Sequence, residues 1–80
     1  MFYVYILKSL KNGSYYIGYT EDLVSRLEMH NLGKVKSTKY RRPFKIIHSE
    51  IYSTATGARK REFYIKRQKS RKFIEELIGL

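Results

Sequence analysis

Residues 2–20 of this 80-residue chain read FYVYILKSLKNGSYYIGYT, and this stretch decides the fold. Phe2 to Ser9 are rich in aromatic and β-branched side chains, which favour a β-strand. Asn12-Gly13 is the strongest short-range signal for a hairpin, and Tyr15 to Tyr19 supplies the return strand. We therefore expect an antiparallel hairpin in which the numbers of facing residues sum to about 25.

A first helix is predicted after the hairpin. Leu23, Leu27 and His30 recur at i, i+4 and i+7, which places them on one helical face. Thr20 is the expected N-cap, and the acidic residues after it suit the positive end of a helix dipole. The helix should run from about Glu21 to Leu32 and end at the glycine that follows.

A third strand is predicted from Phe44 to Tyr52, beyond a basic loop. Strict alternation would place Phe44, Ile46, His48 and Glu50 on one face of the sheet. Apolar residues occur on both faces of this strand, so the pattern does not say which face is buried.

Two further helices are expected at the end of the chain. One follows the cap cluster Ser53–Thr56 and reaches about Gln68, and the other runs from Lys69 to Leu80. The element order is then β-β-α-β-α-α. This order predicts an α+β fold with a three-stranded antiparallel sheet flanked by helices. At this length, residues 1–80 form a single domain.

The charge balance points to a polyanionic partner. Seventeen Lys and Arg against seven Asp and Glu give a net charge of +10, so nucleic acid is the leading partner class. The chain has no cysteine, which excludes a disulfide framework, a thiolate metal site and a cysteine nucleophile. No apolar run approaches the roughly 20 residues of a membrane span, and the N-terminus is unlike a signal peptide. We therefore expect a cytoplasmic protein that needs no membrane.

Most of the cations lie in two clusters, residues 34–45 and residues 59–72. Clustered cations beside exposed aromatic rings can neutralise phosphates and stack on bases. A single such run would be interpreted as a solvated face, but two of them in so basic a chain favour nucleic acid. The candidate nucleic-acid-binding residues are Lys34, Lys36, Lys39, Tyr40, Arg41, Arg42, Arg59 and Lys66.

Two tyrosine motifs carry a resemblance to a known family. Tyr3-Val4-Tyr5 and Tyr16-Ile17-Gly18 are followed by a helical Arg, a His one turn later and a later helical Glu. In this order the chain resembles the GIY-YIG nuclease superfamily over nearly its whole length, and specifically its small standalone members. The resemblance implies the fold described above and hydrolysis of DNA phosphodiesters with one Mg²⁺ or Mn²⁺ ion. Gly18 is expected to be structural, because a residue without Cβ permits a close approach.

The resemblance also implies roles for four of these side chains. Tyr5 would deprotonate or position the attacking water, with help from Tyr16 and His30. A phenol has an ordinary pKa near 10, so this role calls for a nearby cation or metal. Arg26 lies one turn before His30 and matches the arginine that holds the scissile phosphate. For either tyrosine alone, core packing is an equally good interpretation.

Glu62 is the candidate metal ligand. With Ala58 and Ile65 it shares the apolar stripe of its helix, and a lone buried charge needs a partner or a metal. Its position matches the metal-binding glutamate of the family, and a single carboxylate suits Mg²⁺. The structural alternative is an ion pair with a cation within one helical turn, such as Arg59, Arg61 or Lys66.

The sequence therefore predicts a metal-dependent DNA endonuclease with little intrinsic sequence specificity. Single-stranded and branched DNA are among the expected substrates. The alternative is a catalytically weak or inactive nucleic-acid-binding module on the same fold, because an asparagine that some family nucleases place after the glutamate is absent here. RNA as the ligand stays open, and the sequence names no protein partner.

Overall fold

The first two strands form the hairpin that the sequence predicts. The computed structural model describes all 80 residues, and β1 (Phe2–Ser9) pairs with β2 (Tyr15–Thr20) in antiparallel fashion. Tyr5 faces Gly18, so facing residues sum to 23 and the predicted sum of 25 is wrong. The chain turns earlier than expected because the Ser9 hydroxyl accepts the backbone N–H groups of two loop residues.

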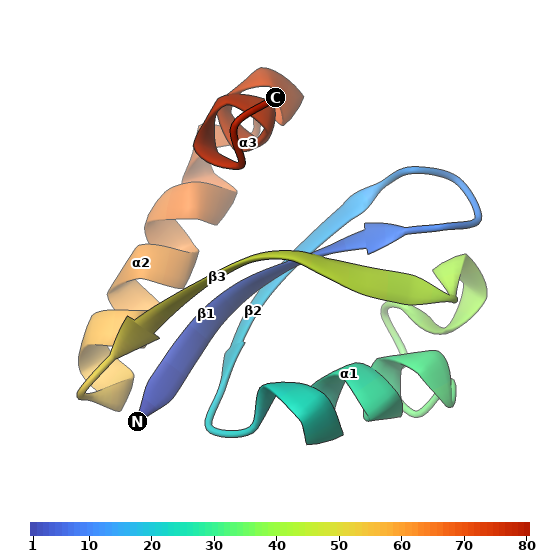
Figure 1. The fold of residues 1–80 in the computed structure, drawn as a ribbon, viewed down its shortest axis with the longest axis horizontal. Helices are drawn as coiled ribbons and strands as arrows, with labels where there is room; N and C mark the ends of the chain where they lie inside the picture. The colour runs from blue at the N-terminus through green and yellow to red at the C-terminus, as the bar shows by residue number, and fades with distance from the viewer.

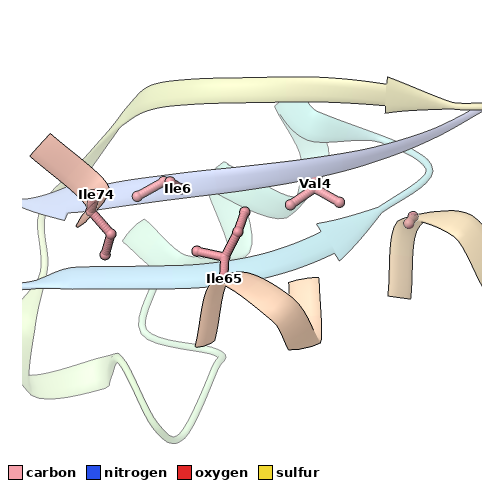
Figure 2. Packing of buried hydrophobic residues seen from close by; sticks show 5 residues of the cluster. Val4, Ile6, Ile65 and Ile74 are labelled. Atoms are coloured by element: carbon pink, nitrogen blue, oxygen red, sulfur yellow. The ribbon is translucent and has the colours of Figure 1, made fainter. Parts of the chain in front are cut away.

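The sheet has the strand order β2-β1-β3, with β1 in the centre, and helices cover both of its faces (Figure 1). On one face, Val4 and Ile6 of β1 pack with Ile65 and Ile74 of the C-terminal helices, as Figure 2 shows. Because side chains alternate along a strand, Tyr5 and its odd-numbered neighbours point to the opposite face, under the first helix. The predicted three-stranded antiparallel α+β fold is confirmed.

The third strand, β3 (Phe44–Tyr52), has the predicted bounds but not the predicted alternation. Leu7 pairs with Ile46 while Ile6 pairs with His48, so Ile47 is an extra residue at a β-bulge. An extra residue reverses the faces for the rest of the strand. Phe44 and Ile46, before the bulge, therefore face the first helix, whereas His48 and Glu50 face the C-terminal helices. The prediction that all four share a face is wrong.

The first helix, α1 (Leu23–Asn31), starts two residues later than predicted. Asp22 is its N-cap, because the Asp22 carboxylate accepts the backbone N–H of Ser25 at 3.1 Å. The prediction of Thr20 as the cap is wrong, since the Thr20 hydroxyl accepts the Asp22 N–H in the preceding turn. A 3₁₀ turn, η1 (Lys39–Arg41), lies within the basic loop.

The two C-terminal helices are α2 (Ala55–Gln68) and α3 (Arg71–Leu77). The α2 N-cap is Thr54, within the predicted cap cluster, and its side chain accepts a backbone N–H of the first turn. Lys69 has a left-handed backbone that ends α2, so α3 is shorter than predicted and is capped by Ser70. No helix in the chain is both long enough and apolar enough to span a bilayer.

Candidate active site

Tyr5 lies at the centre of the site, on the face of β1 that α1 covers. Its side chain is buried, with 2% of its surface exposed. A Cβ atom at Gly18 would lie 2.6 Å from the Tyr5 hydroxyl oxygen, so only glycine leaves room for this ring. Tyr16, two residues along β2, packs on the same face with its ring centroid 6.4 Å from that of Tyr5. The predicted structural role of Gly18 therefore has a concrete cause.

His30 connects Tyr5 to the loop that follows α1. The His30 ring is completely buried, and its Nε2 lies 3.1 Å from the Tyr5 hydroxyl oxygen. Its other nitrogen, Nδ1, lies 2.8 Å from the Thr38 hydroxyl, which itself donates to the Val35 carbonyl at 3.3 Å. Because the Thr38 hydroxyl has used its hydrogen, it accepts from His30, so the proton resides on Nδ1. Nε2 is then free to accept the hydroxyl proton of Tyr5.

Thr38 is the residue that sequence analysis missed. It is fully buried, although it lies in a basic loop where a small polar residue is normally exposed. Its contact with His30 joins residues from two segments, and no periodic pattern connects them. The one available signal is that a buried imidazole needs a second polar partner, and that partner must be found in a loop.

Both protonation equilibria at the site are shifted by burial. Burial raises the pKa of the Tyr5 phenol above its ordinary value of 10.0, and hydrogen bonding from Arg26 opposes only part of this change. Burial, with the charges of Arg26 and Arg41, lowers the pKa of His30 to about 4. At neutral pH Tyr5 therefore carries its proton and His30 is neutral. This arrangement supplies a hydroxyl donor and a proton acceptor in direct contact.

Arg26 projects from α1 towards the two tyrosines. Hydrogen bonding to Tyr5 raises the pKa of the Arg26 guanidinium above its ordinary value, and Tyr16 contributes in the same direction. The predicted grouping of Tyr5, Tyr16, Arg26 and His30 around one point is thus present. A guanidinium at this point can offer parallel N–H donors to a phosphate.

Glu62 lies on α2 with its side chain 16% exposed, and its carboxylate is 3.4 Å from the Lys66 ammonium. Its charge acts on Tyr5 through space, because it raises the pKa of that phenol. No three His, Cys, Asp or Glu side chains gather to hold a metal ion anywhere in the chain. A single carboxylate is nevertheless sufficient for Mg²⁺, which takes its other ligands from water and substrate phosphate. Glu62 therefore fits a one-carboxylate cation site that the substrate completes.

Helix α2 is fixed to β3 by a partly buried ionic network next to Glu62. Arg61 donates to both carboxylate oxygens of Glu50, at 2.8 and 3.1 Å, and Tyr52 and His48 also contact this carboxylate. Burial alone would raise the pKa of Glu50, but these hydrogen bonds outweigh it and lower the pKa to about 2. Because Arg61 precedes Glu62 directly, the network sets where α2 places the Glu62 carboxylate.

The predicted nucleic-acid-binding residues divide into two groups. Three of them are engaged within the protein: Lys66 with Glu62, Arg41 with the Ser14 hydroxyl at 3.0 Å and nearby carbonyls, and Arg42 with the Lys39 carbonyl at 3.1 Å. The others lie on the surface and are exposed, namely Lys34, Lys36, Lys39, Tyr40 and Arg59. The loop after α1 therefore presents most of its cations to solvent.

Comparison with known proteins agrees with this geometry. Residues 1–74 match the family model described as the GIY-YIG catalytic domain. A UPF0213 protein of Staphylococcus saprophyticus is 45% identical over 78 residues, with 92% of this chain and 94% of that protein covered. A UPF0213 protein of Staphylococcus aureus matches to the same extent.

A solved structure is similar to the whole chain. It is the solution NMR structure of a UPF0213 protein from Bacillus halodurans, which is 37% identical with a TM-score of 0.61, covering 99% of this chain and 84% of that chain. A GIY-YIG catalytic domain points to nuclease-type chemistry on nucleic acid, in general with a divalent metal. From its motifs, its fold and these matches, the chain belongs to the GIY-YIG family, together with the small UPF0213 proteins.

Proposed function

We propose that this protein is a metal-dependent endonuclease that hydrolyses DNA phosphodiester bonds with little sequence specificity. The observation that supports this most is the buried hydrogen-bonded chain from Tyr5 through His30 to Thr38. The hydroxyl of a tyrosine that only packs in a core could donate its hydrogen bond to any carbonyl. The Tyr5 hydroxyl instead contacts a neutral imidazole, at the nitrogen that can accept its proton. Such a pair can take up a proton and pass it on.

In the proposed reaction, Tyr5 and His30 act together as the general base. The attacking water transfers a proton to the Tyr5 oxygen while the Tyr5 hydroxyl proton moves to Nε2 of His30. The water oxygen then forms a bond to phosphorus, and the bond from phosphorus to the leaving oxygen breaks. His30 ends as imidazolium, stabilised through Nδ1 by Thr38. Tyr5 thus relays a proton without existing as a free phenolate, which suits its raised pKa.

Arg26 and Glu62 would hold the phosphate from two sides. On substrate binding, the Arg26 guanidinium exchanges a phenol oxygen for phosphate oxygens, which frees a lone pair of Tyr5 for the water. The Glu62 carboxylate, released from Lys66, would be the single protein ligand of Mg²⁺ or Mn²⁺. A cation bound there stabilises negative charge on the leaving oxygen. The surrounding lysines and arginines contact phosphates, which fixes the strand without reading its bases.

The test is a cleavage assay with a matched control. Labelled single-stranded, duplex and branched DNA are incubated with Mg²⁺, with Mn²⁺ and with EDTA. Glu62→Ala should abolish metal-dependent cutting and leave DNA binding nearly unchanged, because it removes one partly buried carboxylate. Glu76→Ala, which removes an exposed carboxylate from α3, should cut like the unaltered protein. If Glu62→Ala still cuts, the assignment of Glu62 is wrong.

The alternative function, a binding module without chemistry, gives a different result in the same assay. Lys66 already neutralises Glu62, and Tyr5 is nearly inaccessible, so both groups must rearrange before catalysis. Retarded but intact DNA with every metal would support the binding module and refute the endonuclease.

A further inference from the structure

A stripe on the outer face of α2 combines an exposed aromatic ring with cations. Arg59, Phe63 and Arg67 are four residues apart, so their side chains lie in a row along one face of the helix. Phe63 is 60% exposed, and the Arg67 guanidinium lies 5.8 Å from the centre of its ring. A shallow hollow of about 310 Å³ lies between Phe63, Arg59 and Lys60. We call these four residues the α2 stripe.

The cations of the α2 stripe have no acidic partners. The carboxylates of the neighbourhood pair elsewhere: Glu62 with Lys66, and Glu50 with Arg61. None of Arg59, Lys60 and Arg67 lies within 4.0 Å of a carboxylate. Concentrated positive charge without counter-charge selects an anionic ligand. The stripe is thus not a salt-bridged helix surface.

The ring at the centre of the stripe restricts the ligand further. Phe63 contributes no hydrogen bond, and its exposed face offers only an apolar, planar surface. The other aromatic residue of α2, Tyr64, is less exposed, at 44%, and packs edge-on against Phe73 with the ring centroids 6.0 Å apart. A ligand that suits Phe63 and its neighbours is both planar and flanked by negative charge. Nucleotides in a single strand have this combination, because each base exposes a π-face and each linkage carries a phosphate.

We infer that the α2 stripe binds an unpaired nucleotide of a single-stranded segment. The base stacks on Phe63, and phosphates on either side contact Arg59 and Arg67, whose α-carbons are about 12 Å apart by the helix rise. Bases inside a duplex have no free face for this contact. Glu62 precedes Phe63 in the chain, but its side chain projects about 100° away around the helix, so the α2 stripe and the candidate cation ligand occupy neighbouring faces of α2. The inference deepens the proposed function, since it selects substrates with unpaired nucleotides near the bond to be cut.

The chain offers a direct reporter for this contact. It contains no tryptophan, so Phe63→Trp introduces the single indole of the protein. Oligothymidylate is titrated into this variant in EDTA, and the same titration is made with an abasic oligomer of equal length. We expect oligothymidylate to quench the indole fluorescence and the abasic backbone to leave it nearly unchanged, because only a base can stack.

Affinity measurements separate stacking from charge. Phe63→Leu should weaken oligothymidylate binding by about 5- to 150-fold, the range that corresponds to losing one stacked base. Binding to a blunt duplex should change less than about twofold, and Phe63→Tyr should retain the affinity. Val24→Ala, which alters an apolar side chain of α1 that is 78% exposed, serves as the control and should change neither.

Three results would overturn the inference. They are an unchanged affinity of Phe63→Leu for oligothymidylate, equal quenching by the abasic oligomer, and stronger quenching by oligoglutamate, which would make the stripe a contact for an acidic protein. All of these measurements are made without metal. Loss of the proposed nuclease activity would therefore leave the base-stacking result intact, and the two proposals can fail separately.

Discussion

Substitution of Gly18 by alanine tests how closely the site is built around Tyr5. A methyl group there would lie 2.6 Å from the Tyr5 hydroxyl oxygen and 2.7 Å from the carbon that bears it. Carbon atoms in contact normally lie about 3.5–4.0 Å apart, so the ring must retreat by about 1 Å. The ring is buried, and its hydroxyl is already 3.1 Å from His30. Retreat therefore distorts or breaks that hydrogen bond.

The expected loss of stability has two parts. Overpacking of a filled core costs about 1–3 kcal/mol. Loss of the Tyr5–His30 hydrogen bond leaves buried polar atoms unpaired and adds about 1–3 kcal/mol. We expect Gly18→Ala to lower the free energy of unfolding by about 2–6 kcal/mol, where a chain of this length has about 4–12 kcal/mol in total. Cleavage should fall with it, because the proton relay loses its geometry.

Urea unfolding followed by circular dichroism measures this loss. Gly57→Ala is the matched control, because its methyl group would meet no atom closer than the Thr54 hydroxyl oxygen at 3.2 Å, a much smaller overlap than at Gly18. The control should change stability by less than about 1 kcal/mol, the size of ordinary glycine-to-alanine effects in helices. A Gly18→Ala protein within 1 kcal/mol of the unaltered one, with its cleavage rate retained, would refute the explanation of Gly18 as the space for Tyr5.

Three further predictions concern the polar groups. Thr38→Val should destabilise the protein by about 1–3 kcal/mol, because the Nδ1–H group of His30 loses its hydrogen-bond acceptor. The nitrogen NMR shifts of His30 should then report a changed tautomer, and an unchanged tautomer would contradict the assignment of the proton to Nδ1. The pKa of His30 is about 4 in the folded protein and 6.5 in the unfolded chain, so the unfolded chain binds the proton more readily as the pH falls below 6.5. The free energy of unfolding should therefore fall by about 3 kcal/mol as the pH drops from above 6.5 towards 4. Unfolding curves measured over this pH range should show a smaller fall for His30→Gln. The cleavage rate should likewise show no titration of His30 near pH 6.5. Glu50→Gln should lower the unfolding free energy by about 1–3 kcal/mol because Arg61 loses its ionic partner, whereas Glu75→Gln, in a more exposed pair, should change it by less than 1 kcal/mol.

The strands and helices could be predicted because their signals are local. The aromatic and β-branched residues before Asn12-Gly13 indicate a strand that ends at a turn. The spacing of Leu23, Leu27 and His30 indicates one face of a helix, and each of these signals lies within a few residues of the element that it predicts. The hairpin register was less accessible, since it depends on the Ser9 hydroxyl, which bonds two loop N–H groups and moves the turn. A side chain that replaces a backbone partner leaves no periodic trace in the sequence.

The candidate site could be predicted as a set of residues but not as a set of protonation states. The motif order named Tyr5 and His30, and both lie together. Sequence reasoning expected nearby cations to lower the pKa of Tyr5, whereas burial raises it. Burial depends on how α1 covers β1, which is a tertiary property. For the same reason Thr38 escaped notice, because its partner lies in another segment of the chain.

The bulge at Ile47 limits the insertions and deletions that the protein can tolerate. Before it, Phe44 packs with the layer that holds α1; after it, Glu50 anchors α2, so one strand serves both layers. Removing Ile47 would turn Glu50 towards the wrong layer and separate it from Arg61. Strand β3 must therefore keep its residue count if the Tyr5 side of the sheet and the Glu50–Arg61 contact are both to be preserved.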